Sequence, residues 1–147
     1  MVRPAPPWVP WATLALAAVG LAVSVYLTVE HYTASTTLAC PETAVVNCRT
    51  VTTSEQATLM GVPLPLFGLA YFVAMLGLGL PAAWRSSSLA VRRTRLGAAI
   101  VGVGFVLYLV VVELFVVNAI CLWCTVVHAC AVALFAVLAY GTAVTAA

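Results

Sequence analysis

Four long apolar stretches constrain this chain more than any other feature. They lie near residues 11–29, 64–84, 96–117 and 121–140. A helix that crosses a bilayer needs about 20 mostly apolar residues, and each stretch comes close to that length. Because 65% of the residues are hydrophobic and only 7% are charged, a soluble domain of this size could not cover its surface with polar groups. The sequence therefore predicts an all-α integral membrane protein, a four-transmembrane-helix bundle that forms a single membrane domain over residues 1–147.

Helices fit these stretches better than strands, because an open sheet edge in lipid leaves backbone N–H and C=O groups unpaired. Arg3 followed by an apolar run also matches the start of a signal peptide. The run is longer than the apolar part of a signal peptide usually is, and three further stretches follow it. We therefore interpret residues 11–29 as the first membrane helix. The sequence shows no internal repeat and no second domain.

The basic residues predict the orientation of the helices. Four of the six lie between the second and third stretches, at Arg85, Arg92, Arg93 and Arg95. Because positive residues accumulate on the cytoplasmic side, we expect this loop and, through Arg3, the N-terminus in the cytoplasm. An even number of spans returns the C-terminus to the same side. The long loop over residues 30–63 is then expected on the outer side of a cell inner or plasma membrane.

Four of the five cysteines form two pairs that this topology places on the outer side. Cys40 and Cys48 lie in the long polar loop, and Cys121 and Cys124 form a Cys-x-x-Cys motif where the fourth stretch begins. At a helix start, this spacing puts both sulfurs on one face about one turn apart. The motif also lowers thiol pKa values. Since the outer side is oxidising, disulfides persist there.

Two such pairs predict electron transfer by thiol–disulfide exchange. Electrons would enter at the loop pair, pass to the Cys-x-x-Cys pair and leave to an acceptor within the bundle. The acceptor must be apolar and take two electrons, and a quinone meets both requirements. A zinc site of four thiolates and a non-catalytic scaffold with two structural disulfides remain as alternatives. The small net charge of +2 argues against a nucleic-acid partner.

Four motifs together resemble the vitamin K epoxide reductase family, including its bacterial members. They are Cys40-x7-Cys48, Ser54 shortly after it, Pro65-Leu66-Phe67-Gly68 at the start of the second stretch, and Cys121-Leu122-Trp123-Cys124 at the start of the fourth. The resemblance covers nearly the whole chain. It implies a four-helix bundle around a quinone of the menaquinone, ubiquinone or vitamin K type. It also implies reoxidation of a thioredoxin-like disulfide oxidase outside the cytoplasm, which we expect to be a separate protein because no thioredoxin-like domain is fused here.

By position, the resemblance assigns a role to each cysteine of the two pairs. Cys40 is expected to form a mixed disulfide with the partner, and Cys48 then to attack Cys121. Cys124 is expected beside the quinone ring, where it is released as a thiolate. Ser54 is expected near the quinone or as a cap of the loop segment.

Three further positions carry the expected quinone contacts. Phe67 is expected to pack near the ring. Leu64 stands where vertebrate members have an Asn that binds substrate, and His128 stands where they have a Tyr. His128 shares a helical face with the Cys-x-x-Cys pair, so it is expected to donate a hydrogen bond to a quinone oxygen or to relay its proton. Both departures favour plain quinone reduction, with vitamin K quinone or epoxide reduction as the alternative main activity.

Two more residues and one rival family complete the expectations. Glu113 is expected to reach the membrane interface or to hydrogen-bond within the bundle, with proton handling as the alternative. Cys130 is expected to be a small buried hydrophobic residue. The DsbB-type oxidases also have four helices and two cysteine pairs. Their Cys-x-x-Cys lies in the first outer loop, which is the reverse of the order found here.

Overall fold

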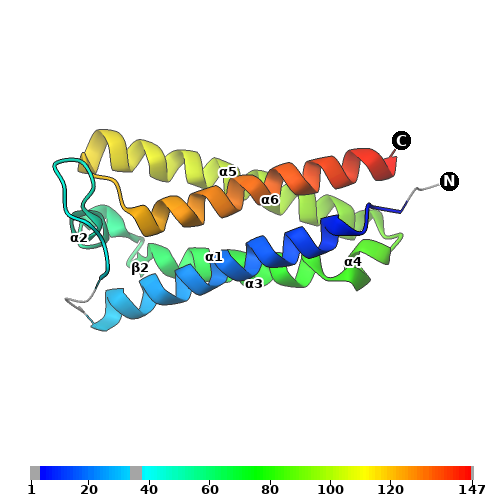
Figure 1. Cartoon of the computed structure of the whole chain (residues 1–147), viewed down its shortest axis with the longest axis horizontal. Helices are drawn as coiled ribbons and strands as arrows, with labels where there is room; N and C mark the ends of the chain where they lie inside the picture. The colour runs from blue at the N-terminus through cyan, green and yellow to red at the C-terminus, as the bar shows by residue number, and fades with distance from the viewer. Residues whose placement is uncertain (1–3, 34–37, 147) are drawn as a thin grey trace.

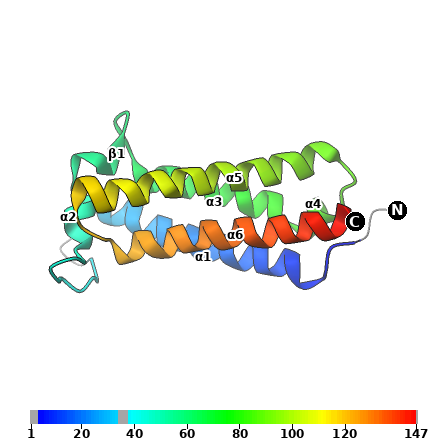
Figure 2. The ribbon, with the colours of Figure 1, turned by 90° about the horizontal axis from the view of Figure 1, so that it is seen from above.

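The computed structural model of this chain describes residues 4–33 and 38–146, so Arg3 lies outside the described residues. The described part is mostly helical, and four helices run side by side along its long axis (Figure 1). α1 (Trp8–Thr33), α3 (Leu64–Gly79), α5 (Leu89–Val111) and α6 (Leu122–Ala146) make up this bundle. The start of α1 and the end of α6 lie at one end, and α2 (Cys48–Thr52) lies at the other (Figures 1 and 2).

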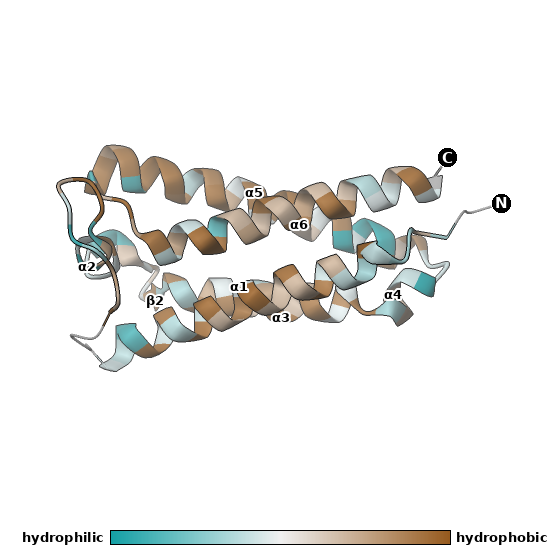
Figure 3. Cartoon of the chain, viewed as in Figure 1, coloured by the Kyte–Doolittle hydropathy of each residue, from teal (hydrophilic) through white to brown (hydrophobic). Residues whose placement is uncertain are grey.

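Three of these helices are long and apolar enough to cross a membrane. They cover Trp8–Thr33, Leu89–Val117 and Leu122–Thr145, and they carry the hydrophobic surface along the middle of the bundle (Figure 3). The helical segment Leu89–Val117 begins earlier than the apolar stretch that we expected at 96–117. Three arginines of the expected loop therefore belong to the first turns of α5. Only residues 86–88 connect α4 to α5 without helical structure.

The second apolar stretch differs from the single helix expected at 64–84. α3 has 16 residues, and a separate helix α4 (Pro81–Arg85) follows it. Leu80 has φ −56° and ψ 144°, which is the extended conformation that a residue before proline favours. Pro81 also lacks the N–H that would continue the α-helical hydrogen bonds. At a rise of 1.5 Å per residue, α3 alone is about 24 Å long, which is shorter than the hydrocarbon layer.

The core of the bundle lies between the four helices. α1 packs against α3 and α6, and α5 packs mainly against α6. Gly20 lets α1 and α3 approach closely, because a Cβ at this position would overlap the ring of Phe72. The buried hydrophobic cluster contains Ala17, Phe72, Met75, Ala99, Val106, Cys130, Ala131, Leu134 and Leu138. Cys130 therefore packs as the small buried hydrophobic residue that its position predicts.

The segment between α1 and α3, expected as a long loop over residues 30–63, has structure of its own. It contains α2, a 3₁₀ turn η1 (Glu55–Ala57) and a small antiparallel hairpin of β1 (Thr58–Leu59) and β2 (Val62–Pro63). Met60 and Gly61 turn the hairpin with φ values of 52° and 79°. Two central residues with positive φ match the right-handed twist of paired strands. The hairpin leads the chain directly into α3.

A change of helix type ends α5 beside the same end of the bundle. The π-helix η2 (Val112–Val117) continues α5, and Asn118 follows it with φ 54°. The N–H groups of Asn118 and Ala119 both donate to the carbonyl of Glu113, which closes the helix. Asn adopts the left-handed conformation at lower cost than other residues with a side chain. The chain then reverses, and a short extended segment leads to Cys121.

Candidate functional site

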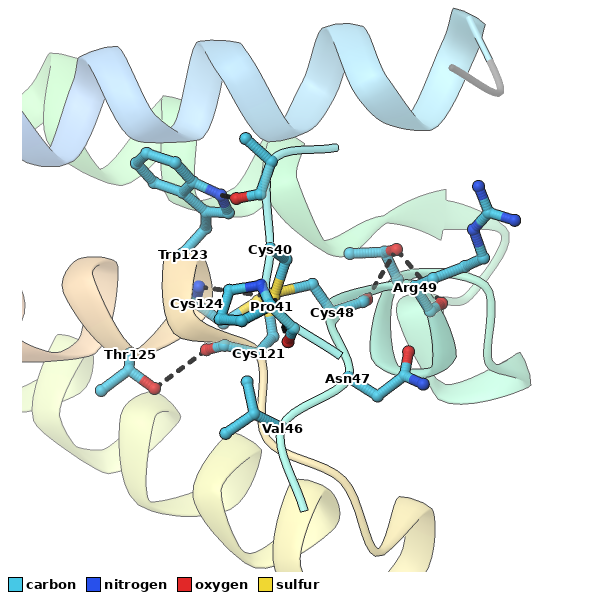
Figure 4. Close-up of a disulfide and its surroundings, with 12 residues drawn as sticks. Cys40, Pro41, Val46, Asn47, Cys48, Arg49, Cys121, Trp123, Cys124 and Thr125 are labelled. Carbon is cyan, nitrogen blue, oxygen red and sulfur yellow. Dashed lines mark hydrogen bonds between the residues drawn. A yellow bond between two sulfur atoms is a disulfide. The ribbon is translucent and has the colours of Figure 1, made fainter. Parts of the chain in front are cut away.

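The loop cysteines form a disulfide at the α2 end of the bundle. Cys40 and Cys48 are bonded, with their Cα atoms 6.1 Å apart (Figure 4). Cys48 begins α2, because the side chain of Asn47 accepts a hydrogen bond from the N–H of Thr50 and caps the helix. Cys48 is fully buried, whereas Cys40 is only half-buried. One sulfur is thus accessible to a partner, and the other faces the protein interior.

Backbone and side-chain hydrogen bonds hold this disulfide against the Cys-x-x-Cys segment. On one side, the N–H of Asn47 donates to the carbonyl of Ile120 at 3.0 Å, and the N–H of Ile120 donates to the carbonyl of Val45 at 2.9 Å. On the other side, Nε1 of Trp123 donates to the carbonyl of Ala39 at 2.9 Å. Both attachments lie next to cysteines in the chain. The two pairs are therefore brought together at one place (Figure 4).

Cys121 and Cys124 are free thiols at the start of α6. Cys121 is fully buried, and its sulfur accepts a hydrogen bond from the N–H of Cys124 at 3.3 Å. Its sulfur therefore satisfies one of the backbone donors that are left unpaired at a helix start. The thiol of Cys124 lowers the pKa of Cys121 by hydrogen bonding to its sulfur, and this outweighs the opposing effect of burial. A lower pKa increases the thiolate fraction, and the thiolate is the nucleophile in disulfide exchange.

A cavity of about 310 Å³ opens between the helices beneath this site. Side chains of α1, α3, α5 and α6 form its walls, and residues of α2 and η1 close the end next to the cysteines. Most of the lining residues are apolar. Cys124 is part of the wall, while Cys121 lies toward the Cys40–Cys48 disulfide (Figure 4). The volume and the apolar lining are typical of a site for a small hydrophobic molecule.

All four residues expected to contact a quinone line this cavity: Ser54, Leu64, Phe67 and His128. The hydroxyl of Ser54 donates to the carbonyl of Val51 at 2.8 Å, so Ser54 also holds the end of α2 in place. The ring of Phe67 lies 6.1 Å from that of Phe105 across the cavity wall. His128 is buried one turn further along α6 than Cys124.

Two further polar residues in the cavity wall are not among the quinone contacts expected from the sequence. The hydroxyl of Tyr71 is buried and finds no hydrogen-bond partner among the described residues. It lies against Gly102, where a Cβ would come within 2.5 Å of it. The buried Glu113 carboxyl group lies near the start of α6 and acts electrostatically on both free cysteines. The sequence contains one signal for Tyr71, because it is the one Tyr in the apolar stretch 64–84. The sequence suggests proton handling as one role of Glu113, but it does not show that Glu113 lies close to the two free cysteines.

The described residues contain no cluster that could hold a metal ion. Within residues 4–33 and 38–146, no three side chains of the His, Cys, Asp and Glu types come together in a suitable group. Two of the four thiolates of the hypothetical zinc site are joined to each other in the disulfide. Of the four cysteines of the two pairs, Cys121 and Cys124 are the two that are present as thiols.

The fold and the site define a class: a helical membrane protein with a disulfide and a dithiol next to an apolar cavity. The sequence matches the vitamin K epoxide reductase family over residues 11–139, and this chain belongs to that family. No curated protein matches the sequence significantly. The family membership expected from the motifs is thus confirmed. Its members are generally oxidoreductases that act on quinones, and the cysteines of this chain fit such activity.

Proposed function

We propose that this protein is a thiol:quinone oxidoreductase that reoxidises a thioredoxin-like, disulfide-forming partner and passes its electrons to a membrane quinone. The observation that carries the proposal is the position of the Cys-x-x-Cys pair. Cys121 adjoins the Cys40–Cys48 disulfide, and Cys124 lies in the cavity wall. One dithiol thus connects a disulfide near the protein surface with an apolar binding site.

Each exchange step breaks one disulfide bond and forms another, and the two electrons and two protons of the partner's dithiol end on Cys121 and Cys124. A thiolate of the reduced partner attacks Cys40, which breaks the Cys40–Cys48 bond and releases Cys48. The second partner thiol then displaces Cys40, and the partner leaves oxidised. Cys48 attacks Cys121 and breaks a Cys121–Cys124 disulfide, and Cys40 completes the exchange by displacing Cys121. The arrangement described here, with Cys40–Cys48 bonded and Cys121 and Cys124 reduced, corresponds to the state after this transfer.

The residues of the cavity fit a quinone head group. A quinone has a flat apolar ring and two carbonyl oxygens that accept hydrogen bonds, and it takes up two electrons and two protons. Phe67 and Leu64 supply apolar contacts, while the unpartnered hydroxyl of Tyr71 supplies a donor. His128 supplies a second polar group on the same wall as Cys124. The apolar side chain of Leu64 favours plain quinone reduction over epoxide reduction, because it offers no hydrogen bond to an epoxide oxygen.

We assign to Glu113 the role of accepting the proton of the Cys124 thiol. In the state described here Cys124 is a thiol, and its proton must leave before its sulfur can react as a thiolate. Glu113 lines the cavity and lies beside both sulfurs. A buried carboxylate at this depth is expensive to keep in a membrane, which is expected where it serves a function.

The same proposal includes a four-span topology. α3 with α4 serves as the second span, and both ends of the chain lie on the cytoplasmic side, where Arg85, Arg92 and Arg93 are found. The cysteine end of the bundle then lies on the outer side, where a partner can reach Cys40. This orientation follows the positive-inside rule and keeps both cysteine pairs in the oxidising compartment.

Quinol formation by the purified chain in detergent tests the proposal. With dithiothreitol as electron donor and a short-chain ubiquinone or menadione as acceptor, we expect the protein to form quinol. The loss of quinone absorbance measures the rate. Cys124→Ala should abolish it, because no sulfur is then left in the cavity wall. Cys130→Ala is the matched control, since Cys130 packs in the hydrophobic core and should be dispensable. A non-catalytic scaffold would give only the uncatalysed rate, both in the wild type and in the two variants.

A further inference from the structure

The end of the bundle opposite the cysteines contains a buried positive charge. Arg95 lies on α5 and is only 3% exposed. Its guanidinium group stacks on the ring of Trp84 from α4, with Cζ 3.5 Å from the ring centroid. Trp84 in turn packs on α6, where a Cβ at Gly141 would come within 2.7 Å of the ring. Trp84 is partly buried, and through it residues of α4, α5 and α6 meet at the stacked pair.

Several hydrogen-bond donors in this region lack acceptors. Among the described residues, the buried atoms Nε and Nη1 of Arg95 and Nε1 of Trp84 have no partner. Oγ1 of Thr142, the residue after Gly141, is also buried without one. Buried polar groups are nearly always paired, and an unpaired charged group is the most costly. The arginine and indole nitrogens can only donate, so an acceptor group is missing from this region.

The acidic side chains of the chain lie too far away to fill that role. They are Glu30, Glu42, Glu55 and Glu113. Glu113 lies on η2, which continues α5, and 18 residues of helix separate it from Arg95, which corresponds to about 27 Å. Arg92, which does act on Arg95 electrostatically, adds a second positive charge instead. The missing acceptor must therefore come from outside the side chains described here, and it should be negatively charged.

We propose that Arg95, Trp84 and Thr142 form a binding site for the phosphate group of an anionic phospholipid. Arg95 lies six residues after the start of α5, about 9 Å along the helix, which corresponds to the depth of the lipid head groups. Leu80 precedes α4 and Leu89 begins α5, and both are exposed, so this end of the bundle offers apolar surface to the acyl chains. The neighbouring arginines favour a lipid with net negative charge over a zwitterionic one.

Native mass spectrometry of the purified chain with added phosphatidylglycerol or phosphatidylcholine tests this site. We expect one phosphatidylglycerol to be retained in preference to phosphatidylcholine. Arg95→Gln should weaken this binding about tenfold, because it removes charge-assisted hydrogen bonds. Arg93→Gln is the matched control, since Arg93 belongs to the same helix and is exposed. Equal weakening by both substitutions, or equal retention of the two lipids, would overturn the proposal.

A second variant separates lipid binding from folding. Trp84→Phe keeps an aromatic ring beneath the guanidinium but removes the indole N–H, so it should retain the helical circular dichroism of the wild type and bind phosphatidylglycerol more weakly. Wild-type affinity for the lipid in this variant would contradict the assigned role of Trp84. Competition with inorganic phosphate at millimolar concentration shows whether the site binds the phosphate of a lipid or a free phosphate ion. Failure to displace the lipid supports the proposal, whereas displacement would identify a site for free anions.

Discussion

At the residue scale, the two sulfurs of the Cys-x-x-Cys motif have different surroundings although only two residues separate them. Cys121 is fully buried next to the loop disulfide and accepts a hydrogen bond from the N–H of Cys124. Cys124 lines the cavity. Cys121 lies just before α6 begins, whereas Cys124 lies in the first turn of that helix, so the two sulfurs have different neighbours. This difference is the physical basis for the relay that we propose.

The lowered pKa of Cys121 predicts a pH effect. Cys124→Ala removes the thiol that hydrogen-bonds to the Cys121 sulfur, so the pKa of Cys121 should rise. At a given pH the thiolate fraction then falls, and alkylation of Cys121 by iodoacetamide should require a higher pH than in the wild type. Peptide mass spectrometry over a pH series measures this. Cys130→Ala should leave the profile unchanged, and an unchanged profile in Cys124→Ala would contradict the assigned hydrogen bond.

Glu113→Gln tests the proton transfer that we assign to this carboxylate. The substitution keeps the size of the side chain and removes its basicity, so quinol formation should slow by about 10²-fold. The deficit should shrink as the pH rises, because solvent can then take the proton. A purely structural role would give a deficit that is independent of pH. Glu55→Gln, in the exposed η1 turn, is the matched control and should retain wild-type turnover.

At the scale of elements, the loop segment is positioned by its attachments to the start of α6. Val46 and Ile120 form an isolated parallel bridge, and Trp123 reaches back to Ala39. The left-handed Asn118 reverses the chain so that Ile120 can pair in this way. Helix periodicity predicts the spans well, but it carries no information on these contacts. Helix periodicity also does not predict that the second stretch divides into α3 and α4, because this division depends on a single residue, Pro81.

Trp123→Phe tests the attachment at Ala39. Phe keeps an aromatic ring at the edge of Tyr26, whose centroid lies 5.1 Å from that of Trp123, but it cannot donate to the carbonyl. Loss of one hydrogen bond of about 1 kcal/mol should slow disulfide formation between Cys48 and Cys121 about fivefold. The rate is measured by mass spectrometry after oxidation, in a chain that lacks Cys40 and Cys124. Trp11→Phe, at an exposed site, should have no effect, and a full rate in Trp123→Phe would rule out this role.

At the scale of the whole molecule, four of the five described arginines lie at the end of the bundle opposite the redox site, and Arg49 on α2 is the exception. The cysteines and the cavity lie near α2, and Arg85, Arg92 and Arg93 lie near the start of α5 (Figure 1). In the orientation that we propose, this separation places the cysteines in the oxidising compartment. It also leaves the two proposed sites, for quinone and for phospholipid, independent of each other.

The proposed orientation predicts labelling from one side only. In a chain otherwise free of cysteine, Thr50→Cys should react with a membrane-impermeant maleimide in intact cells, because α2 lies on the outer side. Ser87→Cys, between α4 and α5, should react only after the cells are permeabilised. The reverse pattern, or equal labelling of both positions, would refute the topology. Each position serves as the control for the other.

The sequence by itself determined the family, the helical membrane architecture and the two cysteine pairs, because these depend on local composition and short spacings. The tertiary structure decided which residues share a wall. Tyr71, Glu113 and Cys124 come from three different helices, and they meet at one cavity because of the way those helices rotate and pack. It also decided that Trp84 stacks with Arg95 inside the bundle. Hydrophobic patterns fix which segments enter the membrane, but contacts between distant segments set the rotation of each helix.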